Sequence, residues 1–538
     1  MRCAKWRDGY ALWPVPGENQ PVLLLRGGLV ADGIGSVTRR GDVLIDGPQI
    51  ASVDARGAAP ADCEVIDLAS GSVICPGFID AHAHAEGPLL ADGRVDGALA
   101  QGVTTLVVGQ DGESWIGASA ATARYLNQYF APVNGALDPP RDLDLAAYRD
   151  AVSGRLTQNV AVLASQGTIR HNIAGLRPGP LEPGERSAAR QQVEDALADG
   201  AVGLSSGLDY LPSRFGGIEE VAGMARPLAR AGRPYVSHLR GYGSEVRAGL
   251  DELVAVGRGA DIRVHASHLW GTPADLQAAF AAAETEGVGV TFDMYPYRRS
   301  STILAMLLLP PEIQARGPQH TLAALADPGQ RADLLAREKF TGDFLQHVYL
   351  GCVPAEAARF AGRSVTEAAR ADARPPGEWV LDLLVGSGLN VGGHLYRPAL
   401  TEGDLAWLEA DDRHCAGSDG IYQGQHPHPR GYSAFARLAE HYLAGEPGAD
   451  GPGHEYQRLA RHLAATAADA FGLTGRGRLA PGLAADICVI EPGGITARAS
   501  YDAPQRLATG VGLVLVNGVI TWRDGQPQRA RFPGRLVS

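Results

Sequence analysis

The middle of the chain alternates short apolar, β-branched runs with helical segments rich in alanine and leucine. The runs include GVTTLVVG, NVAVLAS, AVGLSSG, RPYVSHL, DIRVHASHL and GVTFDMY. Strands that alternate with helices form parallel sheets, because each helix returns the chain to the start of the next strand. About eight such units are typical of a closed (β/α)8 barrel of the TIM type. We therefore predict an α/β fold with such a barrel over residues 76–472.

Both ends of the chain consist of short strand-like runs separated by glycine and Asp-Gly turns. These runs occupy residues 22–53 and, near the other end, the segments ADICVIEP and VGLVLVNGVITWRDGQ. Two β-rich ends that flank one barrel predict a single small domain assembled from both. We expect a small β-sandwich formed by residues 1–75 and 473–538.

The predicted barrel carries one long interruption. More than a hundred residues separate the seventh strand, near Tyr295, from the eighth, which ends near Asp419. This length far exceeds that of an ordinary loop between a strand and a helix. We therefore predict an insertion over about residues 296–413, part of which forms a lid over the active site.

Composition narrows the classes of function. Hydrophobic residues make up 45% of the 538-residue chain and charged residues 20%, as in ordinary globular proteins. The formal net charge of −12, without any run rich in Lys and Arg, argues against a nucleic acid partner. The amino-terminal segment has no apolar run of signal-peptide length, and no stretch of about 18 apolar residues occurs anywhere, so no membrane span is expected. We expect a small-molecule substrate, and the sequence leaves the oligomeric state open, a homo-oligomer included.

The six cysteines are scattered and form no CxxC pair. Such a pattern is unlike a disulfide framework and favours a reducing, cytoplasmic compartment. Cys415, on the predicted eighth strand, has no neighbouring base in the sequence and is interpreted as a buried structural thiol.

The segment PGFIDAHAHAE, at residues 76–86, is the strongest sign of chemistry. His82 and His84 are two residues apart, so on a strand both imidazoles point to the same face. Two inward histidines at the carboxyl end of a barrel strand are placed as metal ligands. The alternative is a pair of surface or hydrogen-bonded histidines, which an HxH pattern alone would also fit.

Three further polar residues end apolar runs. His238 follows PYVS and His268 follows RVHAS, and neutral imidazole is a common ligand of Zn²⁺. Asp419 ends HCAGSD, where a carboxylate can bind a metal and act as a general base, although a lone SDG would also fit a solvated loop. His265 lies three residues before His268 and is expected to face the helices as a structural residue.

Together these residues resemble the amidohydrolase superfamily and, within it, the N-acyl-D-amino-acid deacylase (D-aminoacylase) family. The resemblance covers nearly the whole chain after residue 20. Its more specific segments are GLSSGLDYLPS, FDMYPYRRSSTIL and HPHPRGYSAFARL. It implies a barrel with a small β-sandwich, one or two zinc ions, and hydrolysis of N-acyl groups from D-amino acids.

The resemblance also implies roles for individual residues. The metal ligands would be two histidine pairs, with Asp419 as a further ligand and the catalytic base. Arg430, eleven residues after Asp419, would bind the substrate carboxylate, assisted by Tyr295 and Ser301. The first pair is His82 with His84, and the second is His238 with His268.

Two departures from the family pattern affect the site. Asp111 stands where the deacylases usually carry a cysteine ligand; it either binds the metal through oxygen or hydrogen-bonds backbone amides of a turn. Trp270 stands where relatives tend to have a lysine, so the substrate site has an indole in place of a cation. Arg298 or Arg299 would compensate for that lysine, although a solvated pair of arginines is the simpler interpretation.

Two other functions remain as alternatives. A cyclic-amide hydrolase of the hydantoinase or dihydropyrimidinase kind commonly uses a carboxylated lysine between two metals, whereas the lysines here, Lys5 and Lys339, fit no catalytic strand. A catalytically silent barrel would be expected to have lost ligands. His426 and His428, in HPHP, form a second HxH, but the flanking prolines predict a stiff loop rather than a metal pair.

Overall fold

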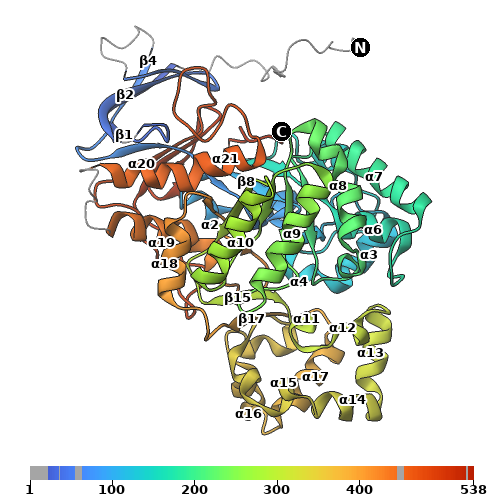
Figure 1. The fold of residues 1–538 in the computed structure, drawn as a ribbon. Helices are drawn as coiled ribbons and strands as arrows, with labels where there is room; N and C mark the ends of the chain where they lie inside the picture. Colours follow the sequence, from blue (N-terminus) through green and yellow to red (C-terminus); the bar gives the residue numbers. More distant parts are fainter. Residues whose placement is uncertain (1–21, 36, 55–62, 445–452, 529–530) are drawn as a thin grey trace.

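The computed structural model describes residues 22–35, 37–54, 63–444, 453–528 and 531–538. Residues 1–21, to which the sequence-based prediction about a signal peptide refers, lie outside the described residues. Figure 1 shows three regions: a β-rich part that combines the blue and red ends of the chain, a central body of strands and helices, and a yellow helical lobe.

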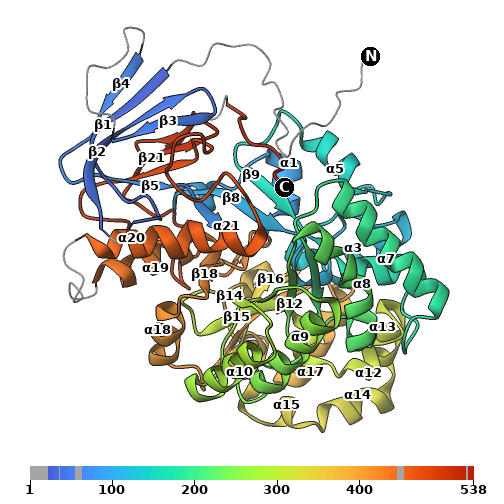
Figure 2. The ribbon, with the colours of Figure 1, turned by 45° about the horizontal axis from the view of Figure 1, so that its top comes forward.

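Residues from both ends of the chain form one nine-stranded sheet. Its order is β23-β22-β21-β20-β5-β1-β2-β3, and β4 also pairs with β1. The antiparallel pairing of β5 with β20 joins the two ends, and the blue and red strands lie together in Figure 2. The strands are β1 (Val22–Val30), β2 (Arg39–Asp46), β3 (Gln49–Val53), β4 (Cys63–Asp67), β5 (Val73–Pro76), β20 (Ile487–Ile490), β21 (Val511–Val516), β22 (Val519–Arg523) and β23 (Gln526–Pro527). The predicted arrangement of two facing sheets stays a prediction.

The central body contains parallel strands in two sheets, ordered β6-β8-β9 and β10-β11-β12-β13-β14-β18. The single residue Leu163 separates β9 from β10, and Ala81 N donates a hydrogen bond to Ala416 O at 3.0 Å beyond the other margin. The strands are β6 (Phe78–Asp80), β8 (Val103–Val108), β9 (Asn159–Val162), β10 (Ala164–Ser165), β11 (Leu204–Gly207), β12 (Tyr235–His238), β13 (Val264–Ala266), β14 (Val290–Met294) and β18 (His414–Ala416).

The burial pattern explains why these segments adopt their structures. All six residues of β8, VTTLVV, are buried, as expected for a parallel strand covered on both faces. The helix α8 (Ile218–Ala231) instead buries one stripe, which includes Val221, Met224 and Leu228, and it ends at Gly232 in the left-handed conformation. Other helices of this region are α6 (Gln166–Ala174), α7 (Pro183–Ala198), α9 (Val246–Ala260), α10 (Pro273–Thr285) and α19 (Arg430–Ala444).

The segment between β14 and β18 has a core of its own, built around residues such as Leu304, Leu350 and Val380. It contains the antiparallel sheet β15-β17-β16 and the helices that form the yellow lobe of Figure 1. The strands are β15 (Arg299–Ile303), β16 (Val348–Cys352) and β17 (Gly392–Tyr396), and the longer helices are α13 (Pro318–Ala326), α14 (Pro328–Leu335) and α17 (Pro376–Gly386).

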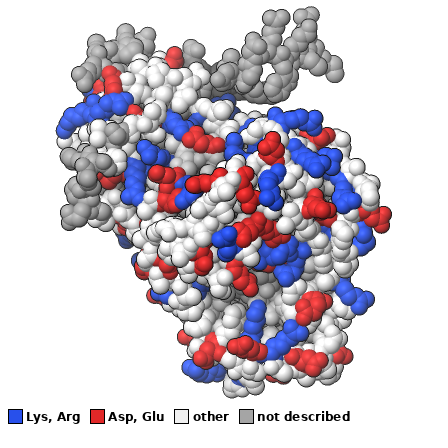
Figure 3. Space-filling model, viewed as in Figure 1, with Lys and Arg blue, Asp and Glu red and all other residues white. Residues whose placement is uncertain are grey.

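On the face shown in Figure 3, Lys and Arg side chains are interspersed with Asp and Glu. Among the described residues, no helix has both the length and the apolar composition needed to cross a bilayer. The five described cysteines are free thiols: Cys63, Cys75, Cys352, Cys415 and Cys488.

Candidate metal centre

The first histidine pair lies directly after β6. His82 and His84 are 0% and 1% exposed, and His84 belongs to the short strand β7 (Ala83–His84). Asp80 anchors this segment, because its Oδ1 accepts hydrogen bonds from His82 N at 3.2 Å and from Ser418 N at 2.8 Å. The same carboxylate thus holds the first histidine next to the loop that carries Asp419.

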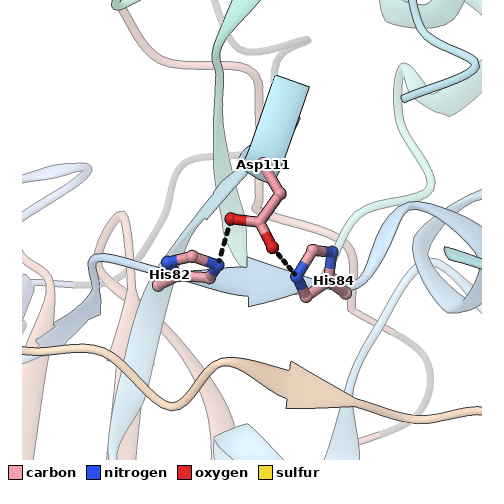
Figure 4. Close-up of side chains that lie close together, drawn as sticks. All are labelled: His82, His84 and Asp111. Carbon is pink, nitrogen blue, oxygen red and sulfur yellow. Dashed lines mark ion pairs between the residues drawn. The ribbon is translucent and has the colours of Figure 1, made fainter. Parts of the chain in front are cut away.

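Asp111 reaches the first histidine pair from the turn after β8. Gly109 starts this turn at φ 79°, and a Cβ there would lie 2.4 Å from Leu163 O, so only glycine fits. The turn continues as the short helix η1 (Gln110–Gly112) and directs the carboxylate between the imidazoles (Figure 4). Asp111 Oδ1 lies 3.5 Å from His82 Nε2, and Oδ2 lies 3.6 Å from His84 Nε2.

The second histidine pair faces the other side of the same carboxylate. His238 ends β12 and His268 follows β13 by two residues, and their Nδ1 and Nε2 atoms are 3.0 Å apart. Asp111 lies 3.7 Å from each of them, through Oδ2 to His238 Nδ1 and through Oδ1 to His268 Nε2. Asp111 therefore stands between both pairs.

Asp419 completes the group three residues after β18. Its Oδ1 lies 3.4 Å from His84 Nε2 and 3.7 Å from His82 Nε2. Its Oδ2 lies 2.7 Å from Arg430 Nη1, and this guanidinium is fully buried. Burial alone would raise the pKa of Asp419, but Arg430 and the neighbouring histidines outweigh burial and hold that pKa below its usual value.

The ligand atoms fit a zinc ion in spacing and in charge. Two triads, His82–His84–Asp111 and Asp111–His238–His268, each place one ligand atom per residue within 4.8 Å of the others. Ligands of a tetrahedral zinc lie about 3.3 Å apart, since zinc binds at about 2.0–2.2 Å. His82 Nε2 and Asp111 Oδ1 are buried without a hydrogen-bond partner, so a cation between them would satisfy both atoms.

The pKa values of two of these histidines, one from each pair, also indicate a site for positive charge. Burial acts to lower the pKa of His84, yet Asp111 and Asp419 outweigh it and raise that pKa to about 10. Asp111 and Asp209 likewise overcome burial and raise the pKa of His238 to about 9. The carboxylates therefore stabilise positive charge at this position, which either protons or a metal ion can supply.

A cavity of about 410 Å³ opens beside this centre. Trp270, Tyr295 and Ser301, the three of the predicted substrate-binding residues that line it, do so together with Asp111 and Asp419. Arg430 is absent from the described residues that line the cavity; it lies behind Asp419 and stacks on Tyr295, with Cζ 4.5 Å from the ring centroid.

Comparison with known proteins places the chain in a family. The family model described as Amidohydrolase family matches residues 361–525. The chain is 32% identical to the N-acyl-D-glutamate deacylase of Alcaligenes xylosoxydans xylosoxydans over 526 residues, 96% of each chain. It is 29% identical to the D-aminoacylase of the same organism, over 97% of this chain and 98% of that one. The chain belongs to the N-acyl-D-amino-acid deacylase family of amidohydrolases.

Solved structures agree with this assignment. The N-acyl-D-glutamate deacylase of Bordetella bronchiseptica, in complex with zinc and a phosphonate mimic of the tetrahedral intermediate, has a TM-score of 0.79 and 26% identity, covering 96% of this chain and 99% of that one. A D-aminoacylase studied for its binuclear metal center has the same score, 26% identity, and 96% and 100% coverage. A D-hydantoinase from Thermus sp. shares the fold only, at a TM-score of 0.54, 15% identity, and 96% and 98% coverage.

Other predicted residues of this deacylase-family chain lie outside the two triads. His426 Nε2 contacts Tyr501 O at 2.5 Å, and His428 is buried among aromatic rings. Cys415 is fully buried, which raises the pKa of its thiol well above the usual value and makes it a poor nucleophile. Arg298 and Arg299 stack on Tyr396 and on Tyr349 with Tyr501, so neither is a free solvated arginine, and neither lines the described cavity.

Sequence reasoning missed the residues that support the ligands. Asp293, in β14, accepts a hydrogen bond from His268 N at 2.9 Å, and its other oxygen lies 3.4 Å from His82 Nδ1 and 3.0 Å from His265 Nε2. Asn134 Oδ1 lies 2.8 Å from His84 Nδ1. Such contacts fix the tautomer and the orientation of ligand histidines. The only available signal was that Asp293 lies in the specific segment FDMYPY.

Proposed function

We propose that this chain is a metal-dependent hydrolase that cleaves the amide bond of N-acyl-D-amino acids and releases a carboxylate and a free amine. The observation that carries the proposal is the position of Asp111 between two histidine pairs, with Asp419 adjacent and a cavity in front. The names of the relatives support the substrate class, because they are deacylases of D-amino acid derivatives.

The residues that would hold zinc follow from the triads. His82 and His84 would bind one ion together with Asp111 and Asp419, and His238 and His268 would share Asp111 for a second ion. One carboxylate serves both places, so the chain would take one or two ions. When bound, zinc lowers the pKa of a water molecule and polarises a carbonyl group.

Asp419 is the proposed general base and general acid. Its lowered pKa keeps it ionised at neutral pH, so it can accept a proton from the attacking water. The amide nitrogen is a poor leaving group until it is protonated, and Asp419, now protonated, returns the proton to it. Arg430 holds the second oxygen of Asp419 and thereby orients the first toward the histidines.

The substrate would lie in the cavity. Tyr295, Ser301 and Trp270 would contact it there, since all three line this space. Arg430 remains a proposed partner of the substrate carboxylate. The indole of Trp270 gives this wall an apolar surface.

We further propose the finer architecture as a closed (β/α)8 barrel over residues 76–472, with a sandwich from residues 1–75 and 473–538. Parallel pairing, the single residue between β9 and β10, and the hydrogen bond from Ala81 to Ala416 support closure. The segment over about residues 296–413 would serve as the lid, because it contributes much of the cavity wall. We also propose that the protein is cytoplasmic.

One experiment tests the function. Purified protein of measured zinc content is assayed with a panel of N-acetyl D- and L-amino acids, and His82→Ala is assayed beside it. We expect D-selective hydrolysis that His82→Ala abolishes together with bound zinc. Full activity in thoroughly chelated protein, or no hydrolysis of any panel member, would reject the proposal; the second result would favour a catalytically silent barrel or a cyclic-amide substrate.

A further inference from the structure

The side chains that line the cavity beside the metal centre include more carboxylates than Lys and Arg side chains. Three carboxylates line it, those of Asp111, Asp209 and Asp419. Two of them belong to the centre itself. Among the described residues that line the cavity, Arg397 is the one Lys or Arg side chain. It directly follows β17, so the segment between β14 and β18 supplies it.

Arg397 is held in place without a carboxylate partner. Arg397 is 8% exposed, and its Cζ lies 4.8 Å from the ring centroid of Trp270 and 5.8 Å from that of Tyr295. Nη2 donates a hydrogen bond to Tyr297 O at 3.1 Å, while Nε is buried and has no partner. No ion pair joins Arg397 to an acidic residue in the described part of the chain.

A buried charge without a counter-charge is unusual. Charged side chains are almost never this buried unless they are paired. The aromatic rings stabilise the guanidinium and fix its plane, so its remaining N–H groups form a pre-organised fork for an oxyanion. Arg430 differs, because its guanidinium is fully buried and already carries the carboxylate of Asp419.

We propose that Arg397 binds the free carboxylate of the substrate, stacked on Trp270. The inference rests on the proposed function and deepens it, because it names a residue that recognises the free carboxylate of the proposed substrates. The carboxylate is either the one attached to the α-carbon or that of an acidic side chain, and both present the same pair of oxygens to the fork.

The test compares kcat/KM between substrates within one enzyme preparation. The fraction of active enzyme then cancels in each ratio of two substrates. The kcat/KM of wild type and Arg397→Met is measured with N-acetyl-D-methionine, N-acetyl-D-methioninamide, N-acetyl-D-glutamate and N-acetyl-D-glutamine. Loss of a charge-assisted contact is expected to cost about 10- to 100-fold. A loss for all three acids that spares the methioninamide assigns the α-carboxylate; a loss confined to N-acetyl-D-glutamate assigns the side-chain carboxylate.

Two controls accompany this variant. Arg413→Met removes a guanidinium that also stacks on an aromatic ring, Phe280, but neither residue is among those described as lining the cavity, so kcat/KM for all four substrates should stay at the wild-type value. Arg397→Lys keeps the positive charge but not the paired N–H groups of the guanidinium, so it should recover part of the kcat/KM that Arg397→Met loses. An equal change for all four substrates, or no change, overturns the inference. If wild type hydrolyses none of them, the proposed function fails separately, and calorimetric binding of N-acetyl-D-glutamate to wild type and Arg397→Met still decides the role of Arg397.

Discussion

Substitution of Asp111 gives the sharpest test of the metal centre. The carboxylate of Asp111 either binds metal or stabilises a turn. The described structure gives no hydrogen bond from a backbone amide to the Asp111 carboxylate, and it places both oxygens 3.5–3.7 Å from four histidine nitrogens. These distances favour the role of a ligand shared by two metal positions.

The expected loss of affinity follows from this geometry. Asp111 supplies one of the three ligand atoms in each triad, so Asp111→Ala would weaken both. Loss of a residue that only supports a ligand costs about 10- to 100-fold in metal affinity. Loss of the ligand itself should reach at least the upper value, which corresponds to about 2.7 kcal/mol.

The backbone conformation of Asp111 makes a second variant necessary beside Asp111→Ala. Asp111 has φ 56°, a left-handed conformation that costs an alanine roughly 1–2 kcal/mol but suits asparagine. Asp111→Asn therefore separates the loss of charge from backbone strain. Zinc affinity is measured by competition with a chelator, and zinc content by mass spectrometry after dialysis, with circular dichroism as a check on folding.

Asp209→Asn is the matched control, since this carboxylate also lines the cavity but is paired with Arg214 at 3.0 Å and, of the four histidines, approaches only His238, at 3.8 Å. It should retain wild-type zinc content. Unchanged zinc affinity and unchanged turnover in both Asp111 variants would refute the shared-ligand interpretation and leave Asp111 as a residue of the turn.

Four further outcomes are expected. Asp419→Asn should lower kcat by about 10²- to 10⁴-fold while zinc remains bound, as measured by steady-state kinetics. Asp293→Asn should weaken zinc binding about 10- to 100-fold in chelator competition, because it supports His82 and His268. Arg430→Met should lower kcat/KM for acids and amides alike if orienting Asp419 is its main role, whereas a loss limited to acids would show that it binds the substrate carboxylate. Burial lowers the pKa of His462 to about 4, so below pH 6.5 the unfolded chain binds a proton that the folded protein does not. The free energy of unfolding should therefore fall by about 2 kcal/mol between pH 7 and 5. In chemical denaturation, His462→Asn should remove this part of the pH dependence.

Local patterns in the sequence predicted the parallel strands and the positions of several site residues. The alternation of apolar runs and helical segments predicted the parallel strands, and strand periodicity placed His82 and His84 on one side. The end of each strand then predicted the positions of His238, His268 and Asp419. These inferences succeed because a strand has a period of two and because the carboxyl ends of parallel strands meet at one edge.

Contacts made by distant segments could not be read in this way. Arg397 reaches the cavity from a segment whose path depends on its own core, and no local pattern fixes where that segment lies. The pairing of Arg430 with Asp419 depends on how α19 starts after an irregular loop. The family resemblance implied that Arg430 binds the substrate carboxylate, whereas the three-dimensional arrangement shows its guanidinium paired with Asp419.

Backbone strain at the centre explains why the supporting residues matter. Asp111, His268 and Asp419 have φ values of 56°, 37° and 47°, a region that costs residues other than glycine about 1–3 kcal/mol each. Specific hydrogen bonds hold two of them there: Asp293 Oδ1 accepts from His268 N at 2.9 Å, and His82 O accepts from Asp419 N at 2.7 Å. The strained residues are the ones that turn a side chain back over the strand ends toward the metal positions. Their stability therefore depends on buried partners on neighbouring strands, so the geometry of the centre belongs to the assembled set of strands and not to any one motif.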